Sequence, residues 1–295
     1  MVKKLLSPQI SVVIVTKNRS RDLIACIGSL LVQSEEIDEL IIVDNDSSDE
    51  TASLILNLKK NCVMNIKYIQ ERRVGYPIIY NRGLKETRFP WVAFIDDDCV
   101  AHPDWFSSIK KSIKKHRNAA VIVGKSNTYF NKNMFSLATL FFNQMWKENG
   151  KIEEKITYFE TLDNKNITYN KDFLVKNNLE FNEKRFKENN GAGEDVDLGL
   201  QISKKKGKAF FVSNMLIQHK DPITFSSYFM KLKFAQNAAK TVENYSEPIA
   251  KDRKYRISNW FHVFSDQQSL NTFLKIKVFS LIVTTVFWQR LWLRH

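Results

Sequence analysis

The sequence predicts a doubly wound α/β domain, with helices on both faces of a mostly parallel sheet, followed by a helical C-terminal extension. Three observations support this class. Short β-branched apolar runs alternate with amphipathic helical patterns about every 25 residues through the first third of the chain. Polar residues follow each apolar run directly, as they do at the carboxyl ends of parallel strands. From Thr224 onward the pattern is helical only.

Four uninterrupted apolar runs define the expected parallel strands, because a strand that is buried on both faces has no need to alternate. The runs are Ile10–Thr16, Leu40–Val43, Ile66–Ile69 and Trp91–Ile95. Helical spacing of apolar residues lies between them. The expected helices are Arg21–Gln33, the segment from the Asp44–Asp49 turn through Leu58, and the segment after Pro77.

The pattern beyond residue 100 is less regular. It predicts two helices, three strands, an aromatic stretch and a charged loop, with no internal repeat. In chain order these are a helix near Asp104–His116, a strand at Ala120–Gly124, the aromatic stretch Phe130–Trp146, a charged loop through Glu160, a helix at Asp195–Lys206 and short strands at Ala209–Val212 and Met215–Gln218.

The chain is basic, but its charge is unevenly distributed. It has 295 residues, 43% of them hydrophobic, and a net charge of +13, which provides apolar material for a real core. Residues 1–100 carry 13 basic and 14 acidic side chains, so the whole excess lies in residues 101–295. A basic chain can bind nucleic acid, an anionic membrane surface or phosphorylated small molecules. The densest basic runs, such as Lys204–Lys206, are typical of solvated helix faces.

The cysteines and the N-terminus indicate a cellular compartment. Cys26, Cys62 and Cys99 are odd in number and widely spaced, which argues against a disulfide framework or a zinc ribbon and favours a reducing environment. The segment before Ile10 is too short for a signal peptide. We therefore expect a cytoplasmic protein.

Asp96, Asp97 and Asp98 end an apolar strand and give the strongest local chemical signal. Three adjacent carboxylates repel one another, so their folding together needs a compensating cation. Mg²⁺ commonly takes one or two carboxylates together with phosphate oxygens. Residues i and i+2 of a strand point the same way, so Asp96 and Asp98 can converge on one site. The alternative is a solvated acidic turn before the helix at Asp104.

Three further positions each fit two interpretations. Asp44 ends a buried strand and can accept hydrogen bonds from a ribose or base edge, or cap the following helix. Glu194 and Asp195 begin a helix after glycines, where a carboxylate can act as a general base or simply favour the helix dipole. His219 follows a strand and is either a metal ligand or an ordinary core or surface histidine.

Five motifs together resemble the family 2 glycosyltransferases of the GT-A fold. In chain order the motifs are Ser11–Arg19, Ile41–Thr51, Asn81–Leu84, Val92–Asp98 and Gly193–Gly199. Each motif alone is weakly specific, but all five occur in the family's order and spacing, and the resemblance covers roughly residues 8–220.

The resemblance implies a role for individual residues. Donor-binding residues would be Thr16, Lys17, Asn18, Asp44, Asn45, Arg72, Arg73, Asp96 and Asp97, with Asp44 on the nucleotide base. Metal ligands would be Asp96 and Asp98 of the Asp-x-Asp motif, together with His219. Catalytic residues would be Asp195, as the base that deprotonates the acceptor, and Glu194 beside it. Many relatives have a glycine-rich stretch after the third strand, whereas Glu71–Pro77 retains only Gly75, which leaves the donor preference open.

The implied activity is the inverting, metal-dependent transfer of a sugar from a nucleoside-diphosphate sugar to an acceptor hydroxyl. The cation would be Mn²⁺ or Mg²⁺. The donor would be a UDP-sugar, with dTDP- or GDP-sugars as alternatives, and the acceptor a saccharide or lipid-linked saccharide. Residues 1–222 would form the catalytic domain, with a nucleotide-sugar half (1–100) and an acceptor half (101–222), and residues 223–295 a basic helical extension.

Two other function classes remain for comparison. A sugar-1-phosphate nucleotidyltransferase shares the sheet and the carboxylates, but it opens with a Gly-x-Gly-Thr-Arg loop that Thr16–Ser20 lacks. A nucleic-acid-binding module would account for the positive charge but would give Asp96 and Asp98 no role. We therefore expect no nucleic acid as a partner.

The C-terminal segment 267–295 has two possible partners. Val278–Trp288 is an uncharged run of eleven residues between basic flanks, Lys275 and Lys277 before it and Arg290 and Arg294 after it. A spanning helix needs about 20 apolar residues, so this run is too short to cross a bilayer. It fits either a helix lying on the inner face of the cell membrane or a helix packing on the core or on a second copy.

Overall fold

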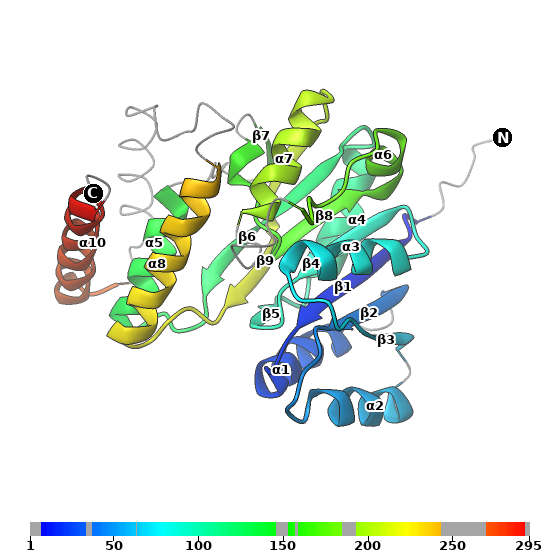
Figure 1. Ribbon diagram of the computed structural model, residues 1–295, viewed down its shortest axis with the longest axis horizontal. Coiled ribbons are helices and arrows are strands. Elements are labelled where there is room, and N and C mark those ends of the chain that lie inside the picture. The colour runs from blue at the N-terminus through cyan, green and yellow to red at the C-terminus, as the bar shows by residue number, and fades with distance from the viewer. Residues whose placement is uncertain are drawn as a thin grey trace. The chain divides into compact units, whose positions relative to one another are not determined.

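The computed structural model describes residues 7–33, 37–62, 64–145, 153–156, 159–184, 193–242 and 270–292. The chain divides into two compact units (Figure 1). The first unit comprises residues 1–126 and 150–218, and the second comprises residues 127–149 and 219–295. The central β-sheet belongs to the first unit, and a cluster of helices forms the second.

Four parallel strands form one half of the sheet, as the sequence predicts. They are β1 (Ile10–Thr16), β2 (Glu39–Asp44), β3 (Ile66–Gln70) and β4 (Trp91–Ile95), in the spatial order β3-β2-β1-β4. The register sets Thr16 beside Asp44 and Asp44 beside Gln70. The carboxyl ends of these strands therefore lie level, and the polar residues that follow them share one edge of the sheet.

The other half of the sheet is joined through antiparallel pairs, so the sheet as a whole is mixed. Strand β4 pairs antiparallel with β8 (Asn166–Asn170), and β8 pairs antiparallel with β6 (Val121–Thr128). Beyond them lie β9 (Ala209–His219) and β5 (Cys99–Ala101), and β7 (Glu153–Ile156) pairs with β9.

Two expectations for this half were wrong. The two short strands expected at 209–212 and 215–218 form one continuous strand, because Ser213 and Asn214 remain extended, with Ser213 half-buried and Asn214 exposed. Strand β7 lies within the segment expected to be a charged loop.

Helices cover both faces of the sheet. Alternate side chains of β1 point to opposite faces, so Val12 and Ile14 pack with α1 and α4, whereas Val13 and Val15 pack with α3. The bounds of the helices in this unit are α1 (Ser20–Leu31), α2 (Thr51–Asn61), α3 (Tyr76–Glu86), α4 (Trp105–Lys115), the 3₁₀ turn η1 (Phe159–Thr161), α6 (Lys171–Lys176) and α7 (Glu194–Lys204).

The second unit is helical. It contains α5 (Met134–Met145), α8 (Phe225–Val242) and α10 (Thr272–Trp292), which share a small apolar core. The predicted C-terminal helices are therefore present. Residues 127–149 group with them, and the functional division of the chain at residue 222 stays a prediction. None of the helices in the described residues has the length and apolarity needed to cross a membrane.

Candidate active site

Asn45 ties together the loops that follow three parallel strands. Its backbone N–H donates to the Thr16 carbonyl at 2.8 Å. Its side-chain Nδ2 donates to the carbonyl oxygens of Glu71 and Arg73, both at 2.8 Å. Asn45 is buried, so its amide fixes the edge of the sheet at which a ligand of an α/β protein binds.

Asp44 is fully buried beneath this edge. Its Oδ1 accepts a hydrogen bond from the Ser47 backbone N–H at 3.0 Å, and its Oδ2 accepts one from the Tyr68 hydroxyl at 2.7 Å. Burial raises the pKa of Tyr68, and the Asp44 carboxylate raises it further. Asp44 thus holds the turn after β2. The alternative that it caps the following helix is wrong, because α2 begins at Thr51 and its N-cap residue is Glu50. Its Oδ1 also accepts a hydrogen bond from Ser47 Oγ at 2.5 Å, so Oδ2 is the oxygen that can accept a second one.

The loop after β1 is locked to the loop after β2. Asn18 has a left-handed backbone (φ +53°), and its N–H donates to Ser47 Oγ at 2.8 Å. Its Oδ1 accepts from the Ser48 N–H at 2.7 Å. Lys17 is exposed between these fixed neighbours. The predicted residues Thr16, Lys17, Asn18, Asp44 and Asn45 therefore lie together at the carboxyl ends of β1 and β2.

Arg19 supplies the cation that the acidic triplet needs. Its Nη1 donates to Asp97 Oδ1 at 2.9 Å and to Asp98 Oδ2 at 2.7 Å. Thr16 Oγ1 donates to the other oxygen of Asp97 at 2.7 Å. Burial raises the pKa of Asp97 to about 6, while Arg19 opposes this rise. Sequence reasoning did not select Arg19 as a site residue. The three adjacent carboxylates predict a compensating cation, and a nearby arginine could have been considered for that role.

Asp96 faces a different neighbour. Strand β4 ends at Ile95, and the triplet forms a turn closed by the Cys99 N–H on the Asp96 carbonyl at 3.1 Å, so strand alternation does not orient these side chains. Tyr80 donates its hydroxyl to Asp96 Oδ1 at 3.3 Å. Burial raises the pKa of Asp96 well above its ordinary range, and the charges of Asp98, Asp163 and Asp97 raise it further.

Glu194 and Asp195 begin α7, directly after Gly193 in the left-handed conformation (φ +93°). Glu194 is buried, and its Oε1 accepts a hydrogen bond from Asn164 Nδ2 at 3.3 Å. Asn164 Oδ1 in turn accepts one from the Tyr169 hydroxyl at 2.9 Å. Burial raises the pKa of Glu194 well above its usual range, and the charge of Asp195 adds to this effect. Asp195 is only partly buried.

The two acidic groups of the site meet around Tyr80. Burial raises the pKa of the Tyr80 phenol, and the charges of Asp96 and Glu194 raise it further. Its ring packs at 5.1 Å from that of Phe181 and stacks at 6.4 Å with that of Tyr76, which is 42% exposed. The structure therefore brings the Asp-x-Asp and Glu-Asp motifs to one place. Sequence reasoning did not identify the two tyrosines between them.

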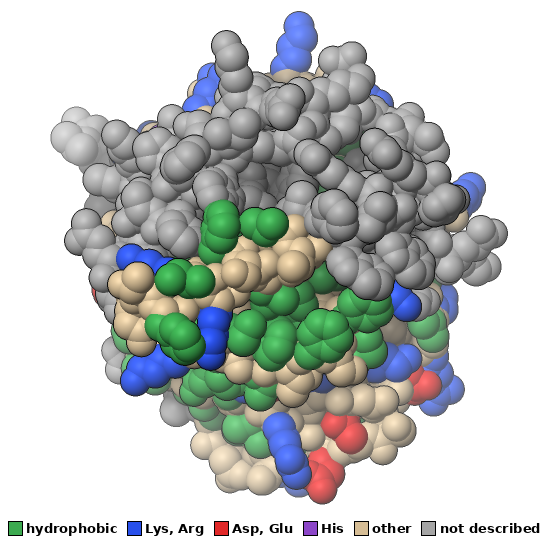
Figure 2. Space-filling view, turned by 90° about the vertical axis from the view of Figure 1, so that its left-hand side faces the viewer, with side chains coloured by type: hydrophobic (Ala, Val, Ile, Leu, Met, Phe, Trp, Pro, Cys, Tyr) green, Lys and Arg blue, Asp and Glu red, His purple; other side chains and the backbone are tan. Residues whose placement is uncertain are grey.

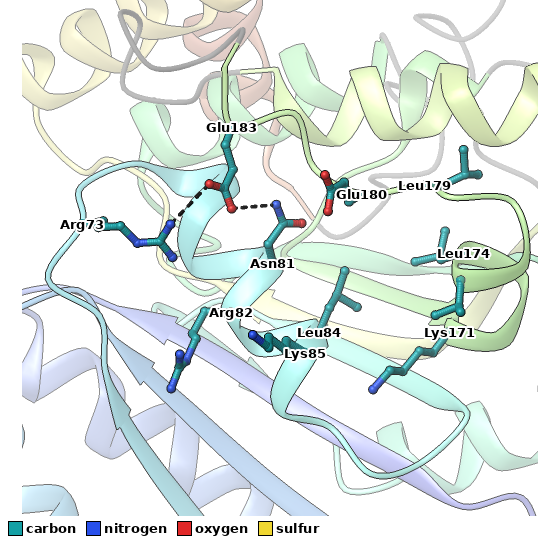
Figure 3. Close-up of a pocket in the computed structure, with 11 residues that line it drawn as sticks. Arg73, Asn81, Arg82, Leu84, Lys85, Lys171, Leu174, Leu179, Glu180 and Glu183 are labelled. Carbon is teal, nitrogen blue, oxygen red and sulfur yellow. Dashed lines mark hydrogen bonds and ion pairs between the residues drawn. The ribbon is translucent and has the colours of Figure 1, made fainter.

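Arg73 is held by carboxylates beside a pocket of about 380 Å³ along α3 (Figure 3). Its guanidinium contacts Glu71 at 2.9 Å and Glu183 at 3.5 Å. Asn81 of the Asn-Arg-Gly motif donates to Glu183 Oε1 at 3.1 Å and to the Phe181 carbonyl at 2.8 Å, which anchors this wall. Arg72 is exposed. The guanidinium of Arg73 is thus already paired with Glu71 and Glu183. Its predicted role is a contact with the donor, which these pairs do not provide.

His219 belongs to the second unit. It is buried, and its Nδ1 lies 2.9 Å from Asp221 Oδ1, which also pairs with Lys231 at 3.3 Å. In the described part of the chain, no three His, Cys, Asp or Glu side chains form a group that could hold a metal ion. The assignment of His219 as a metal ligand stays a prediction.

The family model described as glycosyl transferase family 2 matches residues 11–179, more than half of the chain. The chain belongs to this family. The match spans β1 to β4, the acidic triplet and Asn164, and it confirms the resemblance drawn from the motifs. The mixed sheet with helices on both faces agrees with the GT-A fold that this membership implies.

Two curated relatives are much longer proteins. The chondroitin synthase of Escherichia coli is 30% identical over 122 residues, which cover 41% of this chain and 18% of that protein. The chondroitin synthase of Pasteurella multocida is 22% identical over 246 residues, which cover 72% of this chain and 25% of that protein. The chain therefore spans a quarter or less of the length of these relatives.

Two solved structures share the fold over most of both chains. Staphylococcus aureus TarS 1-349 in complex with UDP-GlcNAc matches with a TM-score of 0.58 at 16% identity, over 88% of this chain and 80% of that chain. The mannosyltransferase PcManGT from Pyrobaculum calidifontis, in complex with GDP-Man and Mn²⁺, matches with a TM-score of 0.61 at 12% identity, over 96% and 80%. At these identities the likeness concerns the fold alone.

Proposed function

We propose that this glycosyltransferase moves a sugar from a nucleoside-diphosphate sugar to an acceptor hydroxyl with inversion at the anomeric carbon. The observation that carries the proposal is the meeting of two carboxylate groups around Tyr80, one after β4 and one at the start of α7. The first group suits a sugar diphosphate and its cation, and the second suits an acceptor. The structural neighbours that hold UDP-GlcNAc and GDP-Man support a nucleotide-sugar donor.

Asp195 is the better base of the acidic pair. Glu194 is buried, and its Oε1 already accepts a hydrogen bond from Asn164, so it is poorly placed to reach an acceptor hydroxyl. Asp195 is more exposed and can approach an acceptor. As the acceptor oxygen bonds to the anomeric carbon, its proton passes to Asp195. The bond from that carbon to the diphosphate oxygen breaks, and the nucleoside diphosphate leaves with the electron pair. Attack opposite the leaving group inverts the configuration.

The residues after β4 fit a divalent cation in their chemistry. Asp96 provides carboxylate oxygens amid the charges of Asp97, Asp98 and Asp163, and hard cations prefer oxygen ligands. Asp96 and Asp98 would hold the cation, with further ligands from the diphosphate. When bound, Mn²⁺ or Mg²⁺ neutralises charge that develops on the leaving diphosphate. The neighbour in complex with Mn²⁺ supports such a cation.

The acceptor is proposed to be a saccharide or a lipid-linked saccharide. The relatives named chondroitin synthase support a role in polysaccharide synthesis. The pairing of Arg73 with Glu71 and Glu183 argues that this arginine shapes the wall of the donor site rather than reaching the diphosphate. Arg72 and Lys17 are exposed and can reach a bound nucleotide.

A donor panel tests the proposal. Release of nucleoside diphosphate is measured with UDP-GlcNAc, UDP-glucose, GDP-mannose and a dTDP-sugar, each with Mn²⁺ and with EDTA, and donor binding is measured by calorimetry. We expect release from one class of donor, and only with Mn²⁺. The Asp195→Asn variant should bind that donor and lose transfer. If no donor binds or reacts in the presence of Mn²⁺, the proposal fails.

A further inference from the structure

Helix α10 buries one apolar face within its own unit. Val278 and Ile282 are nearly inaccessible and pack in a cluster with residues of α5 and α8. Thr285 is on the same side and lies 2.9 Å from the Tyr228 hydroxyl of α8. The helix is therefore fixed against α5 and α8 by this face, which we call the inner face.

The opposite face of α10 is also apolar, although it is exposed. Phe273, Ile276 and Val283 have relative exposures of 67%, 59% and 48%. Their spacing of three and seven residues places them on one side of the helix, and we call them the outer face. A helix that packs only on its own domain normally carries charged or polar residues on its outward side. This face therefore has unused apolar surface that a partner can cover.

Positive charge lies beside the outer face. Residues 267–295 contain four basic residues and no acidic residue. Lys277 is exposed next to the outer face and places its Nζ 4.3 Å from the centre of the Phe273 ring. Figure 2 looks onto the side of the molecule where α10 lies and shows hydrophobic side chains gathered there, with Lys and Arg side chains among and around them. Apolar area flanked by cations complements an anionic lipid surface.

We propose that the outer face of α10 docks on an anionic membrane surface, with the helix lying in the plane of the lipid headgroups. The helix does not meet the requirements for crossing a bilayer. A second copy docking through the same face would place Lys277 of each copy at an interface in which residues 267–295 provide no acidic residue to pair with it. This proposal does not depend on the donor or acceptor of the transfer reaction.

Vesicle co-sedimentation of the full chain tests the docking. Phosphatidylcholine vesicles are compared with mixed phosphatidylcholine and phosphatidylglycerol vesicles. We expect binding to the mixed vesicles only. Ile276→Asn with Val283→Asn should lower the partition coefficient about tenfold, since buried apolar area drives the insertion. Lys275→Gln with Lys277→Gln should lower it about fivefold per lysine, and added salt should have the same effect on the parent.

A matched control separates docking from loss of folding. Leu56→Asn with Val175→Asn removes two similarly exposed apolar side chains from the first unit and should leave vesicle binding unchanged. Circular dichroism confirms that each variant is folded. Equal binding of parent and outer-face variants would overturn the proposal. So would an absence of vesicle binding together with a dimer in analytical ultracentrifugation that Ile276→Asn and Val283→Asn dissociate, because the partner would then be a second copy.

Discussion

Arg19 and Asn164 are the residues on which the geometry of the site depends. Arg19 neutralises Asp97 and Asp98, which lie 78 and 79 residues further along the chain. Asn164 connects Tyr169 to Glu194 inside the protein. The sequence identified the carboxylates, because acidic residues after a strand are visible as a motif. It did not identify these partners, because a pairing over such separations depends on which strands become neighbours.

The acidic pair at the start of α7 should respond unequally to substitution. Asp195→Asn removes the proposed base and should lower kcat by about a hundredfold to ten-thousandfold, with little change in donor KM. Glu194→Gln preserves the size and shape of a buried side chain that is not the proposed base, so kcat should fall by far less. Steady-state kinetics of both variants measure the difference. Equal losses in the two variants would contradict the assignment of Asp195 as the base.

The Arg19 contact predicts a specific effect of Mn²⁺ on stability. Arg19→Met leaves Asp97 and Asp98 without their guanidinium and should lower the free energy of unfolding by about 1 kcal/mol, since the arginine is half exposed. Mn²⁺ can then offset the charge of these carboxylates. The Mn²⁺-induced rise in Tm should therefore be larger in Arg19→Met than in the parent.

Arg88→Met is the matched control for this experiment. Arg88 is also more than half solvent-exposed and pairs with the buried Glu39 at 2.7 Å, at the opposite end of the parallel strands from the acidic triplet. This variant should lose similar stability, and Mn²⁺ should raise its Tm no more than it raises that of the parent. An equal Mn²⁺ effect in both variants would indicate that Arg19 and the cation act at different places.

At the scale of elements, the sequence predicted β1 to β4 because their apolar runs are long and each is followed by polar residues. Strand β8 was missed, since Asn166–Asn170 is short and polar and becomes buried only through distant partners, namely the strands β4 and β6 and apolar residues such as Phe181. The strands β4 and β8 are far apart in the sequence, so no local sequence pattern predicts that they pair. Helices α1 to α4 and α7 were predicted to within a few residues, because amphipathic spacing is a local property. Helix α6 was not predicted, and the region of α5 was identified only as an aromatic stretch.

Close packing of α7 against η1 predicts opposite effects of two glycine substitutions. A Cβ at Gly199 would lie 2.4 Å from the Phe159 carbonyl oxygen, which is backbone and cannot yield. Gly199→Ala should therefore lower the free energy of unfolding by about 1–3 kcal/mol.

Gly28 lies in the middle of α1, and a Cβ added there would meet no atom within 4 Å. Gly28→Ala should raise the free energy of unfolding by about 0.5–1 kcal/mol. Urea denaturation followed by circular dichroism measures both, and destabilisation by Gly28→Ala would show that α1 has no room for the added methyl group.

At the scale of the whole molecule, charge is arranged in two opposing ways. The chain carries a net charge of +13, yet the site collects carboxyl groups whose pKa values are raised by burial, Asp96, Asp97 and Glu194. By contrast, Glu71, which follows β3, and Glu86, at the end of α3, have lowered pKa values because Arg73 and Lys67 donate hydrogen bonds to them. A raised carboxyl pKa opposes folding when the group is ionised, and a lowered one favours folding. Burial of the carboxyl groups in the site therefore costs folding stability, and carboxylates that are paired with arginine or lysine partly offset this cost.

This arrangement predicts opposite pH dependences for two Glu→Gln variants without metal. Because burial raises the folded pKa of Glu194, its carboxyl group costs stability once the pH exceeds the unfolded pKa, and this cost disappears as the pH falls below the unfolded pKa. Glu194→Gln should thus have a higher Tm than the parent at about pH 8, and the difference should vanish towards pH 4.

Glu86 stabilises the fold above its unfolded pKa, and this stability is lost as the pH falls through its lowered folded pKa. Glu86→Gln should have a lower Tm than the parent at neutral pH and the same Tm in acid. The Tm of each variant is measured by thermal unfolding in EDTA and compared with the Tm of the parent at the same pH. This comparison removes the effect that the net charge of the whole protein has on Tm. A lower Tm of Glu194→Gln at every pH would show that the Glu194 carboxylate is stabilised in the folded protein.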